Sequence, residues 1–483
     1  MKKLTATRFY ALVFGAFLGL CIWKFGNPAI LDHKIEAPKT LAELWESAWP
    51  IHWANWLLLV LVLVGAMLLV QRPRRAVLPK RFWWLPLIWL GWQFASATQT
   101  VDAGLTVVTL WQFCGCVACY FLGALVIGGA GHNARRPDQM RLDMVKGFPA
   151  SGLSLLFVGI MAAFVVCQVH AVNQRLYAFP QSYKMLSEGQ RCGWTNFPPA
   201  SIVEMKRENI IVNTNRRDVA NPVIIEKFRK GRVAGTLVYP NALAGLMLLL
   251  FPASLALALA WTEKMRPAIQ CTFVGLLAFL GVTTFYWTGS KLGWLIGIGL
   301  AGLFLFRLNW SKQIKIWAVA IVLILGLGIF TMRFHHYFST GATSAGARFD
   351  YWRAAVQTTM MKPMLGSGPG TFQRSYEQLK APESEMARLT HNDFLEQFSD
   401  SGIIGGLAYL AWIVSSLWFI GRTTPMSGSV QTFSIFAGLL AWFTHSFGEF
   451  GLYIPASAWV AFTLLGCISG RKAIEFDKNQ GSN

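Results

Sequence analysis

The sequence predicts an all-α protein that crosses a membrane about twelve times. Of its 483 residues, 54% are hydrophobic and only 14% are charged, and the mean hydropathy is +0.43. A soluble protein does not place so much apolar surface in water. Apolar segments near the roughly 20 residues that cross a bilayer recur along the chain, and a segment in lipid must satisfy its backbone hydrogen bonds as a helix.

The predicted spans fall into three groups. The N-terminal group occupies residues 1–170, the central group 240–332 and the C-terminal group 403–470. Two of the central spans meet across a very short turn at Gly289. The individual spans are expected near residues 9–25, 51–70, 83–99, 104–129, 151–170, 240–260, 268–288, 291–309, 316–332, 403–421, 431–449 and 455–470.

Positive charge predicts which ends of these spans face the cytoplasm. Lys and Arg collect in short loops, and such loops are cytoplasmic by the positive-inside rule, so the net charge of +20 does not require nucleic acid as a partner. The tail 471–483 is then cytoplasmic and predicted to be disordered. The long polar segments 171–239 and 333–402 lie outside. The basic residues of the short loops are Lys2, Lys3, Arg8, Arg72, Arg74, Arg75, Lys80, Arg81, Arg135, Arg136, Arg141, Lys146, Lys264, Arg266, Lys312, Lys315, Arg422, Arg471 and Lys472.

The outer segment 171–239 has an excess of Lys and Arg that topology does not explain, because long loops translocate regardless of their charge. This excess predicts an anionic ligand. Its basic residues are Arg175, Lys184, Arg191, Lys206, Arg207, Arg216, Arg217, Lys227, Arg229, Lys230 and Arg232.

The cysteines and the N-terminus predict no disulfide, no metal site and no cleaved leader. Seven of the eight cysteines lie in apolar spans and only Cys192 lies in a polar loop, which is not the pattern of a disulfide framework. Cys114, Cys116 and Cys119 lie in mid-span without a nearby His or carboxylate to complete a metal site. The N-terminal stretch lacks the small-x-small pattern of a cleavage site, so an uncleaved first span is expected.

The polar stretch HNDFLEQFSDSGIIGG interrupts this apolar pattern. Thr390 and Asp393 stand in capping-box spacing and predict a helix that begins at His391. Gly402 and Gly405 would let this helix turn into the next membrane span and pack closely there. Two interpretations remain open at this point: His391 completes the helix cap, or it carries chemistry.

A second helix is predicted in ARFDYWRAAVQTTMM, with Arg348 and Trp352 on one face and Pro363 ending it. The glycine loop that follows, at Gly366, Gly368 and Gly370, is either a plain tight turn or a source of backbone N–H groups for a phosphate or a sugar.

Three further polar groups lie at predicted membrane edges. Arg232 and Lys291 each precede a span, where a cation either extends to the interface or binds a lipid phosphate. His445 and Glu449 are predicted to lie one turn apart on a helix and to face inward. All of these groups fall on the outer side of the membrane, and this convergence predicts one site.

These stretches resemble the O-antigen ligase and polymerase family of bacterial envelope glycosyltransferases. The ligase signature is His, then Asn, Ser or Gln, nine free positions, Gly, two free positions, and Gly, Thr or Tyr. His391, Asn392, Gly402 and Gly405 satisfy it. GTLVYPNALAG, TGSKLGW and the combined R-x-x-x-W and P-x-x-G-x-G-x-G pattern match in the same order, so the resemblance covers residues 230–470. The chain departs at Lys291, where many members have Arg, because Lys lacks the bidentate guanidinium fork.

The resemblance implies a glycosyltransferase of the GT-C type in the bacterial inner membrane, with its site on the periplasmic side. It implies a polyprenyl-pyrophosphate-linked glycan donor and no metal or other cofactor. The acceptor remains open: a lipid or core sugar for a ligase, the growing glycan for a polymerase, or a protein side chain for a protein O-oligosaccharyltransferase.

The same resemblance leads to hypotheses for individual residues. His391 takes the acceptor proton, and Arg232 and Lys291 stabilise the pyrophosphate leaving group. Asp393 and Glu396 are further catalytic candidates that orient His391 or contact the ligand. The remaining substrate-binding candidates are Arg348, Asn392, Trp352 and Glu449.

A secondary transporter or flippase for an anionic solute is the alternative from another class. Transporters usually place ionisable groups near the bilayer midplane and often consist of two related halves. This chain carries nearly all of its charge at helix ends and shows no obvious halves. The sequence therefore favours the enzyme.

Overall fold

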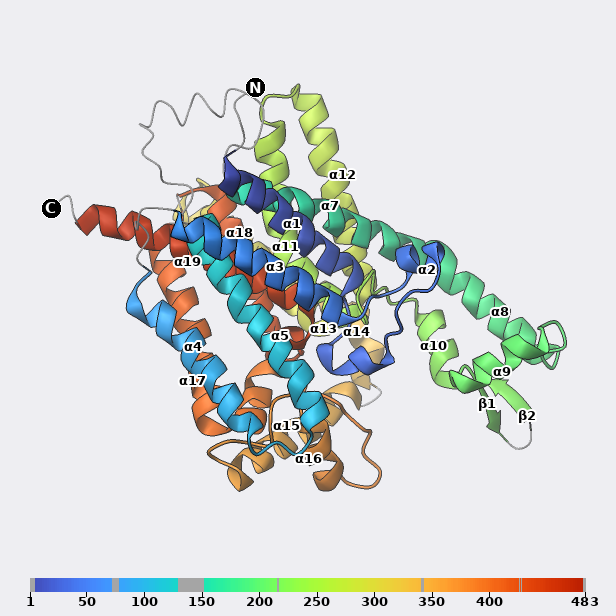
Figure 1. Cartoon of the computed structure of the whole chain (residues 1–483). Coiled ribbons are helices and arrows are strands. Elements are labelled where there is room, and N and C mark those ends of the chain that lie inside the picture. Colours follow the sequence, from blue (N-terminus) through green and yellow to red (C-terminus); the bar gives the residue numbers. More distant parts are fainter. Residues whose placement is uncertain are drawn as a thin grey trace.

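The computed structural model describes residues 5–71, 78–128, 152–214, 217–339, 343–424, 426 and 428–480. It is a bundle of long helices with one small hairpin at its edge (Figure 1). Eight helices in the described part of the chain are long and apolar enough to cross a membrane. The predicted all-α membrane fold is thus confirmed. The number of spans, about twelve, stays a prediction.

The N-terminal helices form one side of the bundle. α1 runs parallel to a later helix, α7 (Gly152–Asn173), and the two pack along their lengths. α5 continues without a break into the π-helical turn η2. The elements are α1 (Ala6–Lys24), η1 (Ala29–Lys34), α2 (Leu41–Glu46), α3 (Ile51–Val70), α4 (Lys80–Ala97), α5 (Ala103–Phe121) and η2 (Leu122–Ile127).

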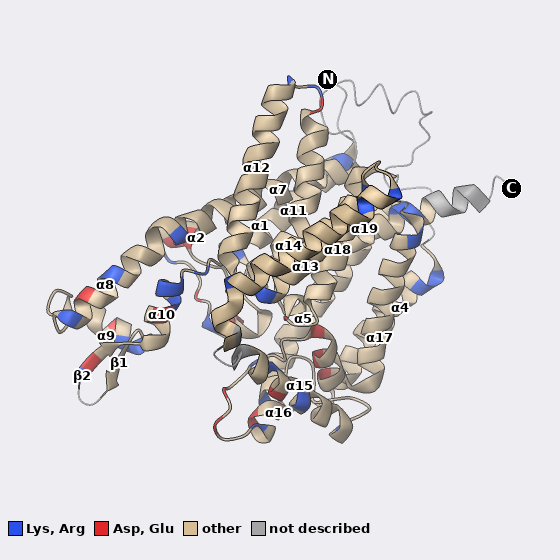
Figure 2. Ribbon diagram, turned by 180° about the vertical axis from the view of Figure 1, so that it is seen from behind, with Lys and Arg blue, Asp and Glu red and all other residues tan. Residues whose placement is uncertain are grey.

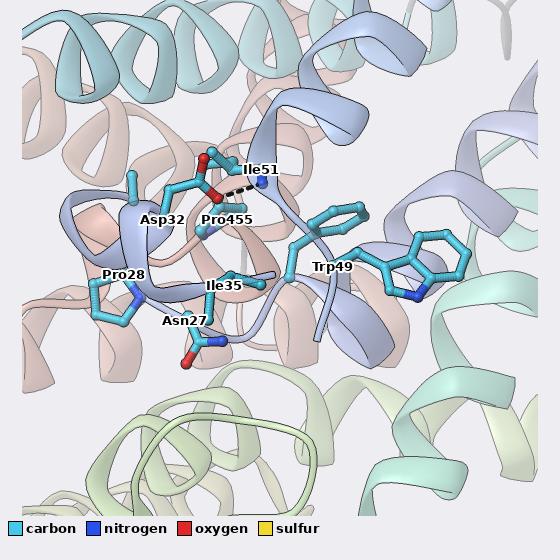
Figure 3. A pocket seen from close by; sticks show the side chains of 9 residues that line it. Asn27, Pro28, Asp32, Ile35, Trp49, Ile51 and Pro455 are labelled. Atoms are coloured by element: carbon cyan, nitrogen blue, oxygen red, sulfur yellow. Dashed lines mark hydrogen bonds between the residues drawn. The ribbon is translucent and has the colours of Figure 1, made fainter. Parts of the chain in front are cut away.

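The loop between α1 and α3 is fixed by polar contacts at both ends. The buried ammonium of Lys24 donates to the carbonyls of Trp45 and Ser47. The Asp32 carboxylate accepts the N–H of Ile51 at 2.7 Å and so caps α3, because Pro50 before it has no side-chain acceptor (Figure 3). The small cavity between these residues has a volume of about 10 Å³, room for one water at most.

The outer segment 171–239 is not a loop, as the sequence suggested, but a projecting arm (Figure 1). α7 runs on through η4 (Gln174–Ala178) and α8 (Phe179–Arg191) as one helical stretch of 40 residues. At 1.5 Å per residue such a helix is about 60 Å long, roughly twice the hydrocarbon thickness. α10 (Pro222–Lys230) and β2 (Arg217–Ala220) pack back on α8, β2 pairs antiparallel with β1 (Ile211–Thr214), and α9 (Pro199–Arg207) packs on β1.

The central helices differ in burial. α11 (Pro240–Thr262) lies in the middle of the bundle and is mostly buried, whereas α12 (Pro267–Thr288) and α14 (Lys312–Ser339) leave most of their apolar side chains exposed. Such exposure fits helices that face lipid. α13 (Lys291–Arg307) packs between α14 and α18 (Val430–His445).

The C-terminal elements surround the predicted site. α15 (Thr343–Met361) ends just before Pro363, as predicted, and the glycine loop leads to α16 (Phe372–Leu379). α17 (Asp393–Thr423) is followed by α18, the short η5 (Gly451–Tyr453) and α19 (Pro455–Gln480). The prediction of a disordered tail is wrong as far as Gln480, because the helix formers Arg471, Lys472 and Ala473 prolong α19 beyond the last apolar turn.

Both termini lie at one end of the bundle (Figure 1), and Lys and Arg mark the same end, at the α11–α12 turn and at the adjoining ends of α4 and α19 (Figure 2). This distribution agrees with a cytoplasmic end, which stays a prediction. Several of the basic residues used for that prediction fall outside the described residues: Lys2, Lys3, Arg72, Arg74, Arg75, Arg135, Arg136, Arg141 and Lys146.

Candidate active site

A candidate site forms where four segments meet at the opposite end of the bundle. They are the link 231–239 before α11, the first turns of α15, the entry to α17 and the loop 446–454 between α18 and α19. The buried carboxylate of Glu449 lies at their junction. The structure therefore brings together Arg232, Arg348, His391 and Glu449, which the sequence placed in one site from separate motifs.

His391 lies just outside α17 and not inside it. The helix begins at Asp393, and the side chain of Asn392 caps it by accepting the N–H groups of Phe394 and Leu395, both at 3.1 Å. The predicted helix start at His391 is thus wrong, because Asn392 caps the helix in place of Thr390. His391 has φ +53°, a left-handed conformation that costs a non-glycine residue about 1–2 kcal/mol.

This turn holds the His391 ring against the Glu449 loop. Its Nδ1 lies 3.3 Å from Glu449 Oε2. Phe450 meets the ring edge-on at 4.8 Å between centroids, and Tyr351 stacks on it at 6.0 Å. The side chain remains 28% exposed, and its Nε2 has no partner among the described residues.

Glu449 is the hub of the site. Its Oε1 accepts from Asn241 Nδ2 at 2.6 Å and from the Arg348 guanidinium, and its Oε2 accepts from the Tyr239 hydroxyl at 2.6 Å and faces His391. The prediction that His445 and Glu449 share a helix is wrong, since α18 ends at His445 and Glu449 lies in the loop beyond it.

Glu449 stays ionised although it is only 2% exposed. Burial by itself raises the pKa of its carboxyl, but the hydrogen bond and charge of His391 and the charges of Arg348 and His445 together lower it to about 2. Asp393 N–H donates to the carbonyls of Ser446 at 2.9 Å and of Glu449 at 3.2 Å, which joins the Glu449 loop to the start of α17.

Replacing Glu449 by Gln should reduce stability in a pH-dependent way. The folded-state pKa lies below the unfolded value of 4.5, so the ionised carboxylate stabilises the folded protein above pH 4.5 by on the order of 3 kcal/mol. That contribution is lost as the pH falls from 4.5 towards 2. The difference in melting temperature between the wild type and Glu449→Gln, measured in detergent between pH 3 and 7, should therefore shrink as the pH falls below 4.5. A constant difference across this range would contradict the assignment.

Arg232 and Lys291 are the two cations of the site without an ion pair to a carboxylate in the described part of the chain. Arg232 donates through Nε to the Thr288 carbonyl and through Nη2 to Asn241 Oδ1, both at 2.7 Å. These contacts keep the guanidinium within the site instead of extending to the interface, and burial lowers the pKa of Arg232. Lys291 Nζ lies 3.7 Å from the centre of the Tyr337 ring, within the electrostatic reach of Arg232. Cations without a direct ion pair in a partly buried site favour an anionic ligand.

Asp393 and Glu396 brace the loop that carries His391. Glu396 Oε2 accepts the N–H and the hydroxyl of Thr390 at 2.8 and 2.9 Å, and Asp393 Oδ2 accepts the N–H of Leu452 at 3.0 Å. Both carboxyls are fully buried. The structure thus gives Glu396 contacts with Thr390, next to His391. It gives Asp393 a contact with the backbone of the Glu449 loop, and neither carboxyl forms a hydrogen bond with the imidazole in the described structure.

Trp352 and the glycine loop form no hydrogen bond with Glu449 in the described structure. Trp352 packs edge-on against Phe349. Gly366, Gly368 and Gly370 all have positive φ, and the N–H groups of Gly368 and Gly370 are bonded to the Asp400 carbonyl at 2.9 Å and to its Oδ2 at 2.7 Å. The geometry agrees with the tight-turn interpretation, because these N–H groups are not free for a phosphate.

Tyr239 and Asn241 are site residues that sequence reasoning missed. They flank Pro240 at the start of α11 in GTLVYPNALAG. The available signal was a polar amide in the first turn of an otherwise apolar span, since such groups in membrane helices usually face a partner. The described residues contain no group of three or more His, Cys, Asp or Glu side chains that could hold a metal ion; a metal-free reaction stays a prediction.

The fold and the site define a class: a polytopic all-α membrane protein with a charged site at one end of its helices. Residues 276–410 match the family model described as O-antigen ligase. The match covers less than a third of the chain, and this segment is similar to the O-antigen ligases. The matched residues include Lys291, Arg348 and His391 but neither Arg232 nor Glu449.

The chain also resembles an uncharacterized protein of Haemophilus influenzae. The two are 26% identical over 177 residues, which cover 31% of this chain and 44% of that protein. The chain thus spans less than half the length of this curated relative.

Proposed function

We propose that the protein transfers a glycan from a polyprenyl-pyrophosphate carrier to an acceptor hydroxyl at the outer face of the bacterial inner membrane. One observation carries the proposal: the unpartnered Nε2 of His391 lies in the same network as Arg232, a half-buried cation that forms no ion pair with a carboxylate in the described residues. A base and an anion-binding group are the two elements that such a transfer requires.

The proposed reaction is a single displacement with inversion. The acceptor oxygen attacks the anomeric carbon of the first donor sugar while His391 Nε2 takes the acceptor proton. The bond from that carbon to the pyrophosphate oxygen breaks, and its electron pair leaves with the polyprenyl pyrophosphate. Arg232 and Lys291 stabilise the charge that develops on the leaving group. Asp393 and Glu396 act through the loop that holds His391.

The acceptor decides between related activities. An O-antigen ligase uses a lipid or core sugar, a polymerase uses the growing glycan, and a protein O-oligosaccharyltransferase uses a protein side chain. The His391, Asn392, Gly402 and Gly405 pattern favours the ligase. A transporter or flippase is disfavoured because the charged groups gather at one end of the helices and not at mid-span.

The decisive experiment is deletion of the gene, with analysis of surface polysaccharide and lipid-linked intermediates by gel and mass spectrometry. Long glycans stranded on the polyprenyl carrier, beside a bare acceptor, would support the ligase. Single repeat units at the surface would indicate a polymerase. Full rescue of the deletion strain by His391→Ala would contradict the glycosyltransferase hypothesis and would favour the transporter hypothesis.

Arg232→Ala should weaken binding of the donor. Arg232 is half-buried and its guanidinium forms no ion pair with a carboxylate in the described part of the chain, so a pyrophosphate would supply one. We expect the dissociation constant of polyprenyl pyrophosphate to rise by about 10-fold to 100-fold, the effect of losing one charge-assisted hydrogen bond. Binding is measured on the purified protein in nanodiscs, with Arg353→Ala, an exposed arginine on α15, as control. Unchanged affinity would remove Arg232 from the anion site.

A further inference from the structure

The Glu449 carboxylate has no free acceptor position. An ionised carboxylate offers about four lone-pair sites, and Tyr239, Asn241, Arg348 and His391 occupy them. All four partners are side chains of this chain. A substrate hydroxyl therefore has no place to bind on Glu449, which argues against the substrate-binding role predicted for it.

The contact with Glu449 selects one tautomer of His391. An ionised carboxylate only accepts hydrogen bonds, so the imidazole nitrogen that faces it, Nδ1, carries the proton. The lone pair then lies on Nε2, the nitrogen without a partner among the described residues. The carboxylate also stabilises the imidazolium that forms when Nε2 takes a proton, as the aspartate does in a Ser-His-Asp triad.

A second chain of hydrogen bonds runs from Glu449 to Arg232. The guanidinium of Arg232 only donates and the carboxylate of Glu449 only accepts, so the Asn241 amide between them has one possible orientation. Its oxygen accepts from Arg232 Nη2 at 2.7 Å, and its nitrogen donates to Glu449 Oε1 at 2.6 Å. The same Oε1 accepts from Arg348. The Glu449 carboxylate thus determines the positions of His391, Arg232 and Arg348.

We propose that Glu449 is the positioning residue of this site. It keeps the proton of His391 on Nδ1, so that Nε2 is the base, and through Asn241 it holds Arg232 in a fixed position relative to His391. The inference rests on the proposed function, since it assigns roles to the base and the anion-binding arginine of that reaction. Glu449 acts through its neighbours and does not touch the substrate.

A double-mutant cycle tests the first half of the proposal. Glu449→Gln keeps the side-chain shape and removes the charge, so kcat for transfer should fall by about 10²-fold to 10⁴-fold. Because Glu449 acts through His391, the variant with both Glu449→Gln and His391→Ala should be no slower than His391→Ala alone. A merely structural role would make the two losses multiply, and that result would overturn the proposal.

Matched variants keep the test independent of folding. Rates are measured on monodisperse protein with lipid-linked donor from the deletion strain, and Glu383→Gln, an exposed glutamate of the same outer region, should match the wild type. Tyr239→Phe removes one hydrogen bond and leaves the charge in place. It should lower kcat by about tenfold and remain testable if Glu449→Gln does not fold. An unchanged kcat in Tyr239→Phe would contradict the positioning role of Glu449.

The second half of the proposal, the link from Glu449 through Asn241 to Arg232, predicts that the effects of substituting Asn241 and Arg232 on donor binding are not additive. Asn241→Ala should weaken binding of polyprenyl pyrophosphate, and should add nothing to the loss caused by Arg232→Ala. Additive losses would overturn the Asn241 link. If His391→Ala keeps full transfer, the proposed function itself fails. If His391→Ala is inactive while Glu449→Gln keeps its kcat, only the positioning role fails.

Discussion

His391→Ala is expected to reduce glycan transfer by about 10²-fold to 10⁴-fold, the usual loss when a positioned general base is removed. The variant lacks the nitrogen that takes the acceptor proton. Tyr239, Asn241 and Arg348 still hold Glu449, so the protein should insert and fold. Transfer is measured by complementation of the deletion strain and with purified protein, at matched protein level.

Two further variants separate chemistry from backbone effects at His391. Asn tolerates the left-handed conformation of this position better than Ala does, so His391→Asn should be equally inactive and at least as stable. His335→Ala, in an exposed position of α14, should transfer normally. Wild-type transfer by His391→Ala or His391→Asn would remove His391 from the mechanism.

Gly402→Ala is expected to prevent accumulation of folded protein. Gly402 has φ +70° and ψ −173° inside α17, a region that is essentially restricted to glycine and costs other residues on the order of 1–3 kcal/mol. A Cβ there would also lie within 2.6 Å of the carbonyl oxygen of Pro363. Ile403 N–H donates to that same carbonyl at 2.8 Å, so the backbone has little freedom to move away. Together these effects amount to several kcal/mol.

Folding of Gly402→Ala is checked by size-exclusion chromatography in detergent and by thermal melting. Gly91→Ala is the matched control, because a Cβ on Gly91 in α4 would meet no atom within 4 Å. In a helix interior Ala is preferred over Gly by roughly 0.5–1 kcal/mol, so this control should be at least as stable as the wild type. A wild-type melting curve for Gly402→Ala would show that the kink is not required.

The positions of the eight candidate membrane helices in the described residues followed largely from hydropathy, because a helix in lipid needs a long apolar run whatever its neighbours are. The 40-residue helix that ends at Arg191 did not follow from it. Its outer half is polar and is supported by packing against α10 and the hairpin. The same limit applies to α19, which continues to Gln480 through residues that hydropathy assigned to a tail.

The residues of the site followed from motif spacing only in part. The His391, Gly402 and Gly405 spacing identified the loop and its kink. It did not show that Asn392 caps the helix or that Asp393 and Glu396 contact the neighbouring backbone, because those contacts depend on which partner a polar group finds once the chain has folded.

By itself, the sequence determined the class of the protein, the positions of its membrane helices and the motif of the O-antigen ligase family. These properties reside in runs of residues that are local in the chain. Only the tertiary structure decided which charges meet. Glu449, Arg232 and His391 come from segments far apart in the sequence, and a buried carboxylate becomes a hub only where folding places enough donors around it to compensate its lost hydration.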